Sequence, residues 1–175
     1  PLGNTTAVAG VTGAFSLPIT SITINSKLHV TGGASSGSAL RISRNVYDAD
    51  DNQVNVGFTV ANFVINYETK QVLADLTLNG ATTAKVPFYN FNVATPLALK
   101  YKFPLNIVGN EVLDNLRLTP EAKTASIDGL ILEDFEIPSL DLDYGTLTQN
   151  ISLIARKPAV SAAPYIAKLD FPLGA

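Results

Sequence analysis

The densest group of side chains that could bind a metal lies in one short stretch of the chain. Asp48, Asp50, Asp51 and Asn52 place four oxygen-bearing side chains close together. Calcium prefers several oxygen ligands supplied from a single turn, and the spacing partly matches such a loop. The central glycine and the closing bidentate glutamate are missing. These residues are therefore a candidate for weak calcium binding, with a polar hairpin turn as the alternative, and we expect no other cofactor.

Groups that could carry out catalysis are scarce. The chain has one histidine, His29, and no cysteine, which excludes thiol nucleophiles and zinc–thiolate or iron–sulfur sites. A Ser-His-Asp triad would have to include His29, and no Gly-x-Ser-x-Gly elbow accompanies it. Asp141 and Asp143 could supply a pair of carboxylates for glycoside hydrolysis. Their alternation along one predicted strand is more typical of a solvated face, so the sequence predicts a protein that is not an enzyme.

Composition limits the partners. Charged residues make up 15% of the chain and the formal net charge is −3, without any cluster of Lys and Arg. Nucleic acid and anionic lipid both attract clustered positive charge, so we expect no nucleic-acid partner. No apolar run reaches the roughly 18 residues that a membrane helix needs, and we expect a chain that does not span a membrane.

The first residue and two glycosylation patterns bear on location. Pro1 stands where an initiator Met would be, and a cleaved signal peptide leaves such an end. We therefore expect a secreted or cell-surface protein. Asn4 and Asn150 each begin an Asn-x-Ser/Thr pattern, which matters only in a host that glycosylates.

Alternation of apolar and polar residues with period two runs through most of the chain and is the mark of half-buried strands. It is clear from Ile22 to Val30 and from Val54 to Val60. A slip at Ala61-Asn62 predicts a β-bulge, and Asn79-Gly80 predicts a tight hairpin. The Gly- and Ser-rich residues 31–38 are predicted to form a flexible loop.

One short helix is predicted near residues 120–128. Thr119 fits the N-cap, Pro120 fits the first helical position, and Gly129 could close the helix. Three more strands are predicted over residues 131–137, 140–153 and 165–171. The predicted fold class is all-β, an antiparallel β-sandwich or flattened barrel of about eight to eleven strands, in a single domain of residues 1–175.

The N-terminal residues 1–17 are predicted to form an extended arm. Its apolar residues Val8, Val11, Phe15 and Leu17 could pair with the open sheet edge of a neighbouring subunit, or form a first strand of the same domain. The predicted function is a structural or adhesive subunit of a surface assembly (filament, pilus or matrix), forming a homo-oligomer or polymer by β-strand pairing. The alternative is a secreted binding module for carbohydrate or a small hydrophobic ligand.

Overall fold

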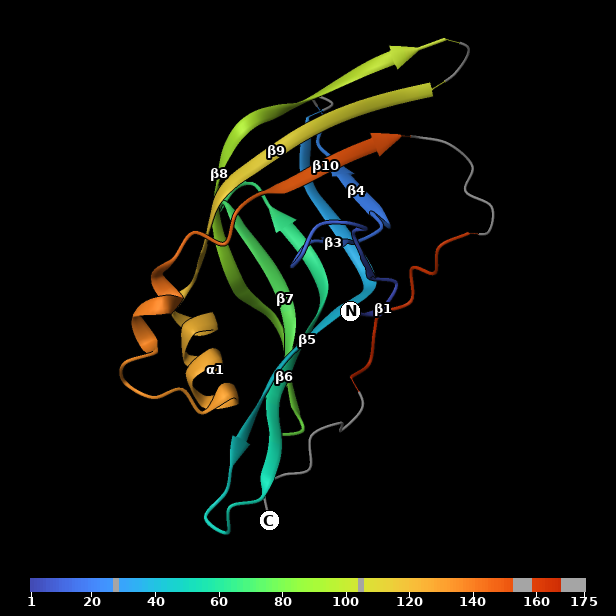
Figure 1. The fold of residues 1–175 in the computed structure, drawn as a ribbon. Coiled ribbons are helices and arrows are strands. Elements are labelled where there is room, and N and C mark those ends of the chain that lie inside the picture. Colours follow the sequence, from blue (N-terminus) through green and yellow to red (C-terminus); the bar gives the residue numbers. More distant parts are fainter. Residues whose placement is uncertain (27–28, 104–105, 153–158, 168–175) are drawn as a thin grey trace.

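The protein is built on one large antiparallel sheet that curls into a half-barrel (Figure 1). The computed structural model describes residues 1–26, 29–103, 106–152 and 159–167. The eight strands of the main sheet are β1 (Leu2–Gly3), β4 (Ser21–Ile24), β5 (Val30–Tyr47), β6 (Gln53–Asn66), β7 (Gln71–Leu78), β8 (Ala81–Lys102), β9 (Asn106–Leu118) and β10 (Leu147–Ser152). Their order is β1-β5-β6-β7-β8-β9-β10, and β4 pairs with β5 on the same edge as β1. A small second sheet consists of β2 (Thr6–Ala7) and β3 (Phe15–Ser16).

These features confirm the predicted antiparallel all-β fold. A single α-helix, α1 (Pro120–Leu130), appears in the described part of the chain, where the sequence predicts it. No helix among the described residues is both long and apolar enough to cross a membrane.

Local turn signals in the sequence are confirmed. Asn79 and Gly80 both have positive φ, 50° and 76°, and join β7 to β8 with Leu78 paired to Ala81. The predicted bulge lies where the register between β6 and β7 shifts after Ala61. Asn62, at φ 54°, occupies this bulge, and Asn tolerates this left-handed conformation better than most residues.

The side chain of Asn62 ties distant segments to the bulge. Its Oδ1 accepts hydrogen bonds from the backbone N–H groups of Gly37 (3.0 Å) and Tyr165 (2.7 Å). Its Nδ2 donates to Asp75 Oδ2 (2.8 Å) and to Tyr165 O (3.0 Å). Nearby, Asn4 Nδ2 donates to Ser161 O at 2.9 Å. The segment 159–167 is therefore held against the edge of the sheet formed by β1 and β5.

Residues 31–38 do not form the predicted loop but belong to β5. Glycine suits position 32 of this strand because a neighbouring backbone approaches it closely. A Cβ on Gly32 would lie 3.2 Å from the carbonyl oxygen of Ile65, whereas one on Gly33 would make an ordinary contact, 3.6 Å from Gln149 Oε1. Gly37, at φ 76°, marks the irregular stretch between Ser35 and Ala39 where the register with β6 shifts.

The region after the helix departs furthest from the predictions. Residues 131–136 form turns and irregular chain instead of a strand, and Ile137–Asp141 forms a 3-10 helix, η1. The strand predicted for residues 140–153 begins only at Leu147, and residue 153 lies outside the described part. Residues 165–167 are not in a strand, and residues 168–171 are not described.

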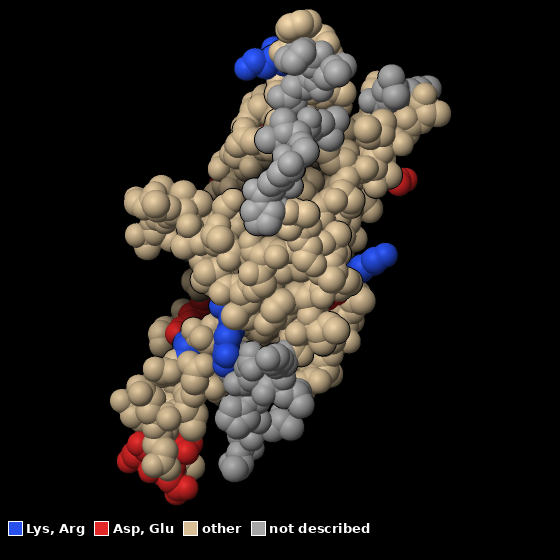
Figure 2. Space-filling view, turned by 90° about the vertical axis from the view of Figure 1, so that its right-hand side faces the viewer, with Lys and Arg blue, Asp and Glu red and all other residues tan. Residues whose placement is uncertain are grey.

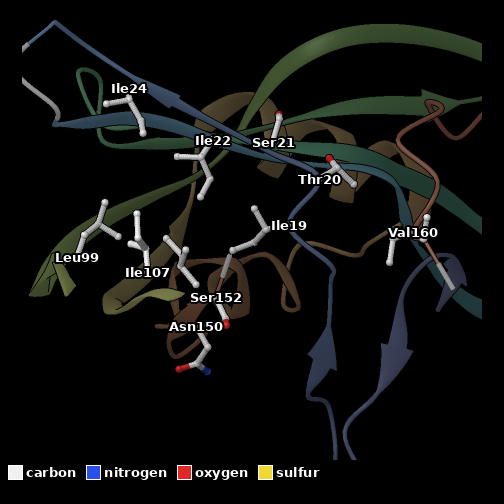
Figure 3. Close-up of a pocket in the computed structure, with 12 residues that line it drawn as sticks. Ile19, Thr20, Ser21, Ile22, Ile24, Leu99, Ile107, Asn150, Ser152 and Val160 are labelled. Atoms are coloured by element: carbon white, nitrogen blue, oxygen red, sulfur yellow. The ribbon is translucent and has the colours of Figure 1, made fainter. Parts of the chain in front are cut away.

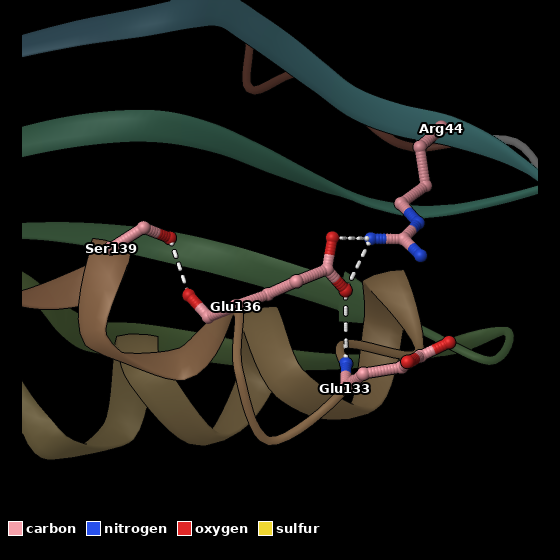
Figure 4. Close-up of polar contacts among 4 residues, drawn as sticks. All are labelled: Arg44, Glu133, Glu136 and Ser139. Atoms are coloured by element: carbon pink, nitrogen blue, oxygen red, sulfur yellow. Dashed lines mark hydrogen bonds and ion pairs between the residues drawn. The ribbon is translucent and has the colours of Figure 1, made fainter.

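Side-chain hydrogen bonds explain why the segment before η1 does not extend. Arg44 Nη1 on β5 donates to both carboxylate oxygens of Glu136, at 2.7 and 2.9 Å (Figure 4). The same carboxylate accepts from the backbone N–H of Glu133 at 2.9 Å, and Ser139 Oγ donates to Glu136 O at 2.6 Å. The bonds of Glu136 with Glu133 and Ser139 are local and compete with a strand ladder. The bond from the Glu133 N–H, followed by the bond from Arg44 and its positive charge, lowers the pKa of Glu136.

Helix α1 covers one end of the sheet. Thr119 Oγ1 accepts from the N–H of Ala122 at 3.2 Å, which confirms the predicted N-cap, and donates to Pro87 O at 2.6 Å. Gly129 does not close the helix, because the left-handed cap is Ile131 at φ 51°. Gly129 instead lets the helix lie flat on the sheet, since a Cβ there would lie 2.7 Å from Phe58.

Apolar side chains on one face of the sheet form two clusters. Val72 and Ala74 alternate on β7, so they share a face, and each belongs to a different cluster. The helix-covered cluster contains Phe58, Val60, Ala74, Phe88, Leu118, Ala122 and Leu140. The inner cluster, inside the curve of the half-barrel, contains Ile65, Val72, Phe91, Leu113 and Leu116.

Candidate functional site

A polar cluster joins distant strands across the inside of the half-barrel. Tyr67 follows β6, Glu111 is on β9, and Gln149 is on β10. Tyr67 Oη and Gln149 Nε2 both donate to Glu111 Oε2, and Gln149 Nε2 lies 2.8 Å from Tyr67 Oη. In a flat sheet β6 and β9 would be roughly 14 Å apart, at about 4.8 Å per strand. The direct hydrogen bond between them is therefore possible only because the sheet curls.

Glu111 is a carboxyl group in an apolar interior. Its side chain is 2% exposed, and it also accepts a hydrogen bond from the backbone N–H of Leu97. Burial raises the pKa of Glu111, while the bonds from Tyr67 and Leu97 partly oppose that shift. Burial and the neighbouring carboxyl also raise the pKa of the Tyr67 phenol, which therefore remains a donor. The cluster is internally satisfied and works as a bridge across the half-barrel.

The two edges of the main sheet face each other across a gap, which we call the seam. β4 ends the sheet beside β5, β10 ends it beside β9, and no other described strand pairs with the outer side of either. β10 approaches the far side of the sheet where its Gln149 side chain lies near Gly33 of β5, the strand next to β4. No pairing joins β4 to β10 among the described strands, so the sheet remains a half-barrel.

A cavity of about 600 Å³ lies in the seam (Figure 3). Ile22 is opposite Gly33 in the register of β4 and β5, so its side chain is on the same inner side as Gln149. The described lining residues are mostly aliphatic, and none of them is charged: Ile19, Thr20, Ser21, Ile22, Ile24, Leu99, Ile107, Asn150, Ile151, Ser152, Ala159 and Val160. Figure 2 shows that the described surface on this side of the molecule is largely uncharged, and its largest acidic group lies at the bottom.

The calcium candidates lie together in the turn between β5 and β6. Asp48 Oδ1 accepts from the backbone N–H groups of Asp50 and Asn52, both at 2.9 Å, and these bonds contribute to the lowered pKa of Asp48. Asp51 has φ 60°. The Asp48 carboxylate thus stabilises the turn by accepting hydrogen bonds from its backbone. In the described residues no group of three or more His, Cys, Asp or Glu side chains could hold a metal ion, and calcium binding stays a prediction.

The predicted arm is partly folded onto its own domain. β1 pairs with Ser38 and Ala39 of β5, and Thr5 Oγ1 accepts from the N–H of Ala39 at 3.0 Å. Beyond Thr5 the chain forms the β2–β3 hairpin. Its apolar side chains are Val8 (39% exposed), Val11 (55%), Phe15 (40%) and the half-buried Leu17. Their predicted contact with a neighbouring subunit remains a prediction.

Sequence reasoning missed the bridge formed by Tyr67, Glu111 and Gln149, and it missed the seam. No protein-family model matches the chain, and comparison with curated proteins and with solved structures finds no significant match. What this protein does is therefore inferred from the chemistry of the seam and of the arm.

Proposed function

We propose that this protein is a non-enzymatic structural or adhesive subunit of an extracellular surface assembly, such as a filament, pilus or matrix. Its copies associate by pairing β-strands. The observation that supports this proposal is the seam, in which β4 and β10 end the sheet without a further described strand. An unpaired edge is a template for another chain, because its N–H and C=O groups can continue the ladder.

The cavity favours an extended peptide as the occupant of the seam. A strand directs alternate side chains to one face, so one set can enter the aliphatic cavity. Its backbone can hydrogen-bond to β4 and β10 at the same time. A hydrocarbon ligand would fill the cavity but leave those edges to water. A peptide strand therefore suits both the aliphatic cavity and the unpaired strand edges beside it.

Molecular mass as a function of concentration tests this function. Sedimentation velocity of the full chain should show oligomers that grow with concentration. Ile22→Lys places a charge in the cavity and should weaken association, with circular dichroism confirming the fold. The matched control is Phe135→Lys, which changes a 77% exposed apolar residue beyond the helix and should leave association intact. A monomer at every concentration would contradict the proposed function.

A second candidate is a binding module for a small hydrophobic ligand. The cavity volume of about 600 Å³ falls in the usual range for such sites, roughly 300 to 1,000 Å³. None of the described lining residues is aromatic, so the site lacks the flat surface on which a sugar ring stacks, and an apolar ligand suits it better. A fatty acid that raises the melting temperature of the wild type, but not of Ile22→Lys, without changing the molecular mass would favour this candidate.

A further inference from the structure

The direction of the strands defines what can complete the seam. From β4 to β10 the sheet contains seven strands in a row, and each neighbouring pair is antiparallel. Six reversals bring the chain back to its starting direction, so β4 and β10 run the same way. One additional strand of opposite direction would therefore be antiparallel to both edges. A sheet closed with eight strands has an interior that side chains can just fill.

We propose that the seam accepts one strand from a second copy of this chain, running antiparallel to both β4 and β10, and that residues 11–17 of the β2–β3 hairpin supply it. This inference rests on the proposed function and adds the donor segment and its direction. It also explains why an isolated copy keeps an aliphatic cavity between two strand edges.

The side chains of residues 11–17 suit this role. Val11, Phe15 and Leu17 have one parity and alternate with Thr12, Ala14 and Ser16. In an extended conformation the apolar set would enter the cavity and the small or polar set would face outward. The segment carries no charge, and neither do the described lining residues of the cavity, so none of these groups is an ion that would lose its hydration on binding.

The segment is held weakly in its own hairpin. The small sheet has two paired positions, Thr6 with Ser16 and Ala7 with Phe15, and one further backbone bond from Val8 N to Ala14 O at 2.9 Å. Val11 and Phe15 are 55% and 40% exposed there. Moving the segment into a seam would bury these side chains and replace a short ladder by two longer ones.

The path of the chain directs the segment to a second copy. The carbonyl of Pro18 accepts from Ser35 Oγ at 2.7 Å, and Thr20 N donates to Ala34 O at 2.8 Å. Residues 18–20 therefore continue the line of β4 along β5. A tight turn there, which would lay residues 11–17 beside the β4 of the same molecule, is incompatible with these bonds.

Engineered cysteines test the contact, because the chain has no other thiols. Thr12→Cys or Ser16→Cys in one sample is mixed with Thr148→Cys or Ser152→Cys in the other, under oxidising conditions. Thr148 and Ser152 are on the exposed face of β10. An antiparallel strand should link Ser16→Cys with Thr148→Cys, and Thr12→Cys with Ser152→Cys, several-fold more than the two crossed combinations. Thr124→Cys, exposed on α1, is the matched control and should not link.

Each result decides a different point. Oligomers without any of these links would overturn the donor assignment and leave the proposed function standing. Preference for the crossed combinations would overturn the direction. A link within one molecule of the double variant Ser16→Cys/Thr148→Cys would overturn the role of a second copy. A strict monomer would remove the proposed function itself.

Discussion

The two ends of the half-barrel both carry apolar side chains, but these are buried at one end and partly exposed at the other. At one end α1 packs over the sheet, and Phe58, Phe88 and Ala122 are at most 2% exposed. At the other end no described helix covers the seam, which Ala159 and Val160 of segment 159–167 help to line, and Ile24, Leu99 and Ile107 are 36 to 49% exposed. Both ends belong to one continuous sheet. The difference is one of cover: α1 buries the apolar surface at one end, while the described residues leave part of it exposed at the other.

The largest contrast should appear when one side chain is removed from each end. Phe58→Ala should lower the free energy of unfolding by about 3 to 5 kcal/mol, because it leaves a cavity beneath α1. Ile22→Ala in the half-exposed seam should cost about 1 to 2 kcal/mol. Urea unfolding of both variants measures the two losses. Equal losses would mean that the seam is as well packed as the helix-covered end.

A second experiment measures how much stability the hydrogen bonds among Tyr67, Glu111 and Gln149 give to the end of the half-barrel that no helix covers. Tyr67→Phe removes the phenol that donates to the buried Glu111 carboxyl. The expected loss in unfolding free energy at neutral pH is about 1.5 to 3 kcal/mol. Asn45→Ala, on an exposed position of β5, should change stability much less and serves as the control. No loss in Tyr67→Phe would show that the phenol hydrogen bond contributes nothing to the stability of the fold.

A third experiment weakens the cover at the other end. Thr119→Ala removes both the N-cap of α1 and the donor to Pro87 O. We expect a loss of about 1 to 2 kcal/mol in unfolding free energy. Thr119→Ser keeps the hydroxyl and should recover most of it. If serine restores nothing, the methyl group of Thr119 matters more than its hydrogen bonds.

The smallest expected effect is a change in pH dependence. Because the pKa of Glu111 is raised in the folded state, the folded protein binds more protons than the unfolded one above pH 4.5, the ordinary value. Stability should therefore fall as pH rises from 4.5 toward the raised pKa. Glu111→Gln should remove this contribution. Subtracting its stability–pH curve from that of the wild type isolates it from Asp48 and Glu136, whose lowered pKa values act with the opposite sign. A flat difference would contradict the burial of Glu111.

Features that depend on neighbouring residues in the sequence could be predicted, and more of them lie at the helix-covered end than at the seam. Thr119 and Pro120 begin a helix through backbone constraints that act within a few residues. Asn79-Gly80 specifies a hairpin in the same local way. The fold class follows from alternation, which each strand shows by itself.

Features that depend on strand order could not be predicted. Residues 31–38 resemble a loop by composition, and the approach of the Ile65 carbonyl that favours glycine at position 32 arises only once β5 and β6 pair. Tyr67 and Glu111 meet because the sheet curls, and no local pattern connects residues 44 positions apart. Likewise, the seam could not be predicted, because the sequence does not reveal that β4 and β10 are the edges of the sheet.

The hydrogen bonds that hold segment 159–167 to the sheet determine how that segment could detach. Segment 159–167 returns to the sheet through point contacts, namely the bonds of Asn62 with Tyr165 and of Asn4 with Ser161. A force pulling this segment away from β1 would load those few bonds first and the long ladder between β5 and β6 only afterwards. Release of these hydrogen bonds should therefore free the segment without breaking any strand pair of the main sheet.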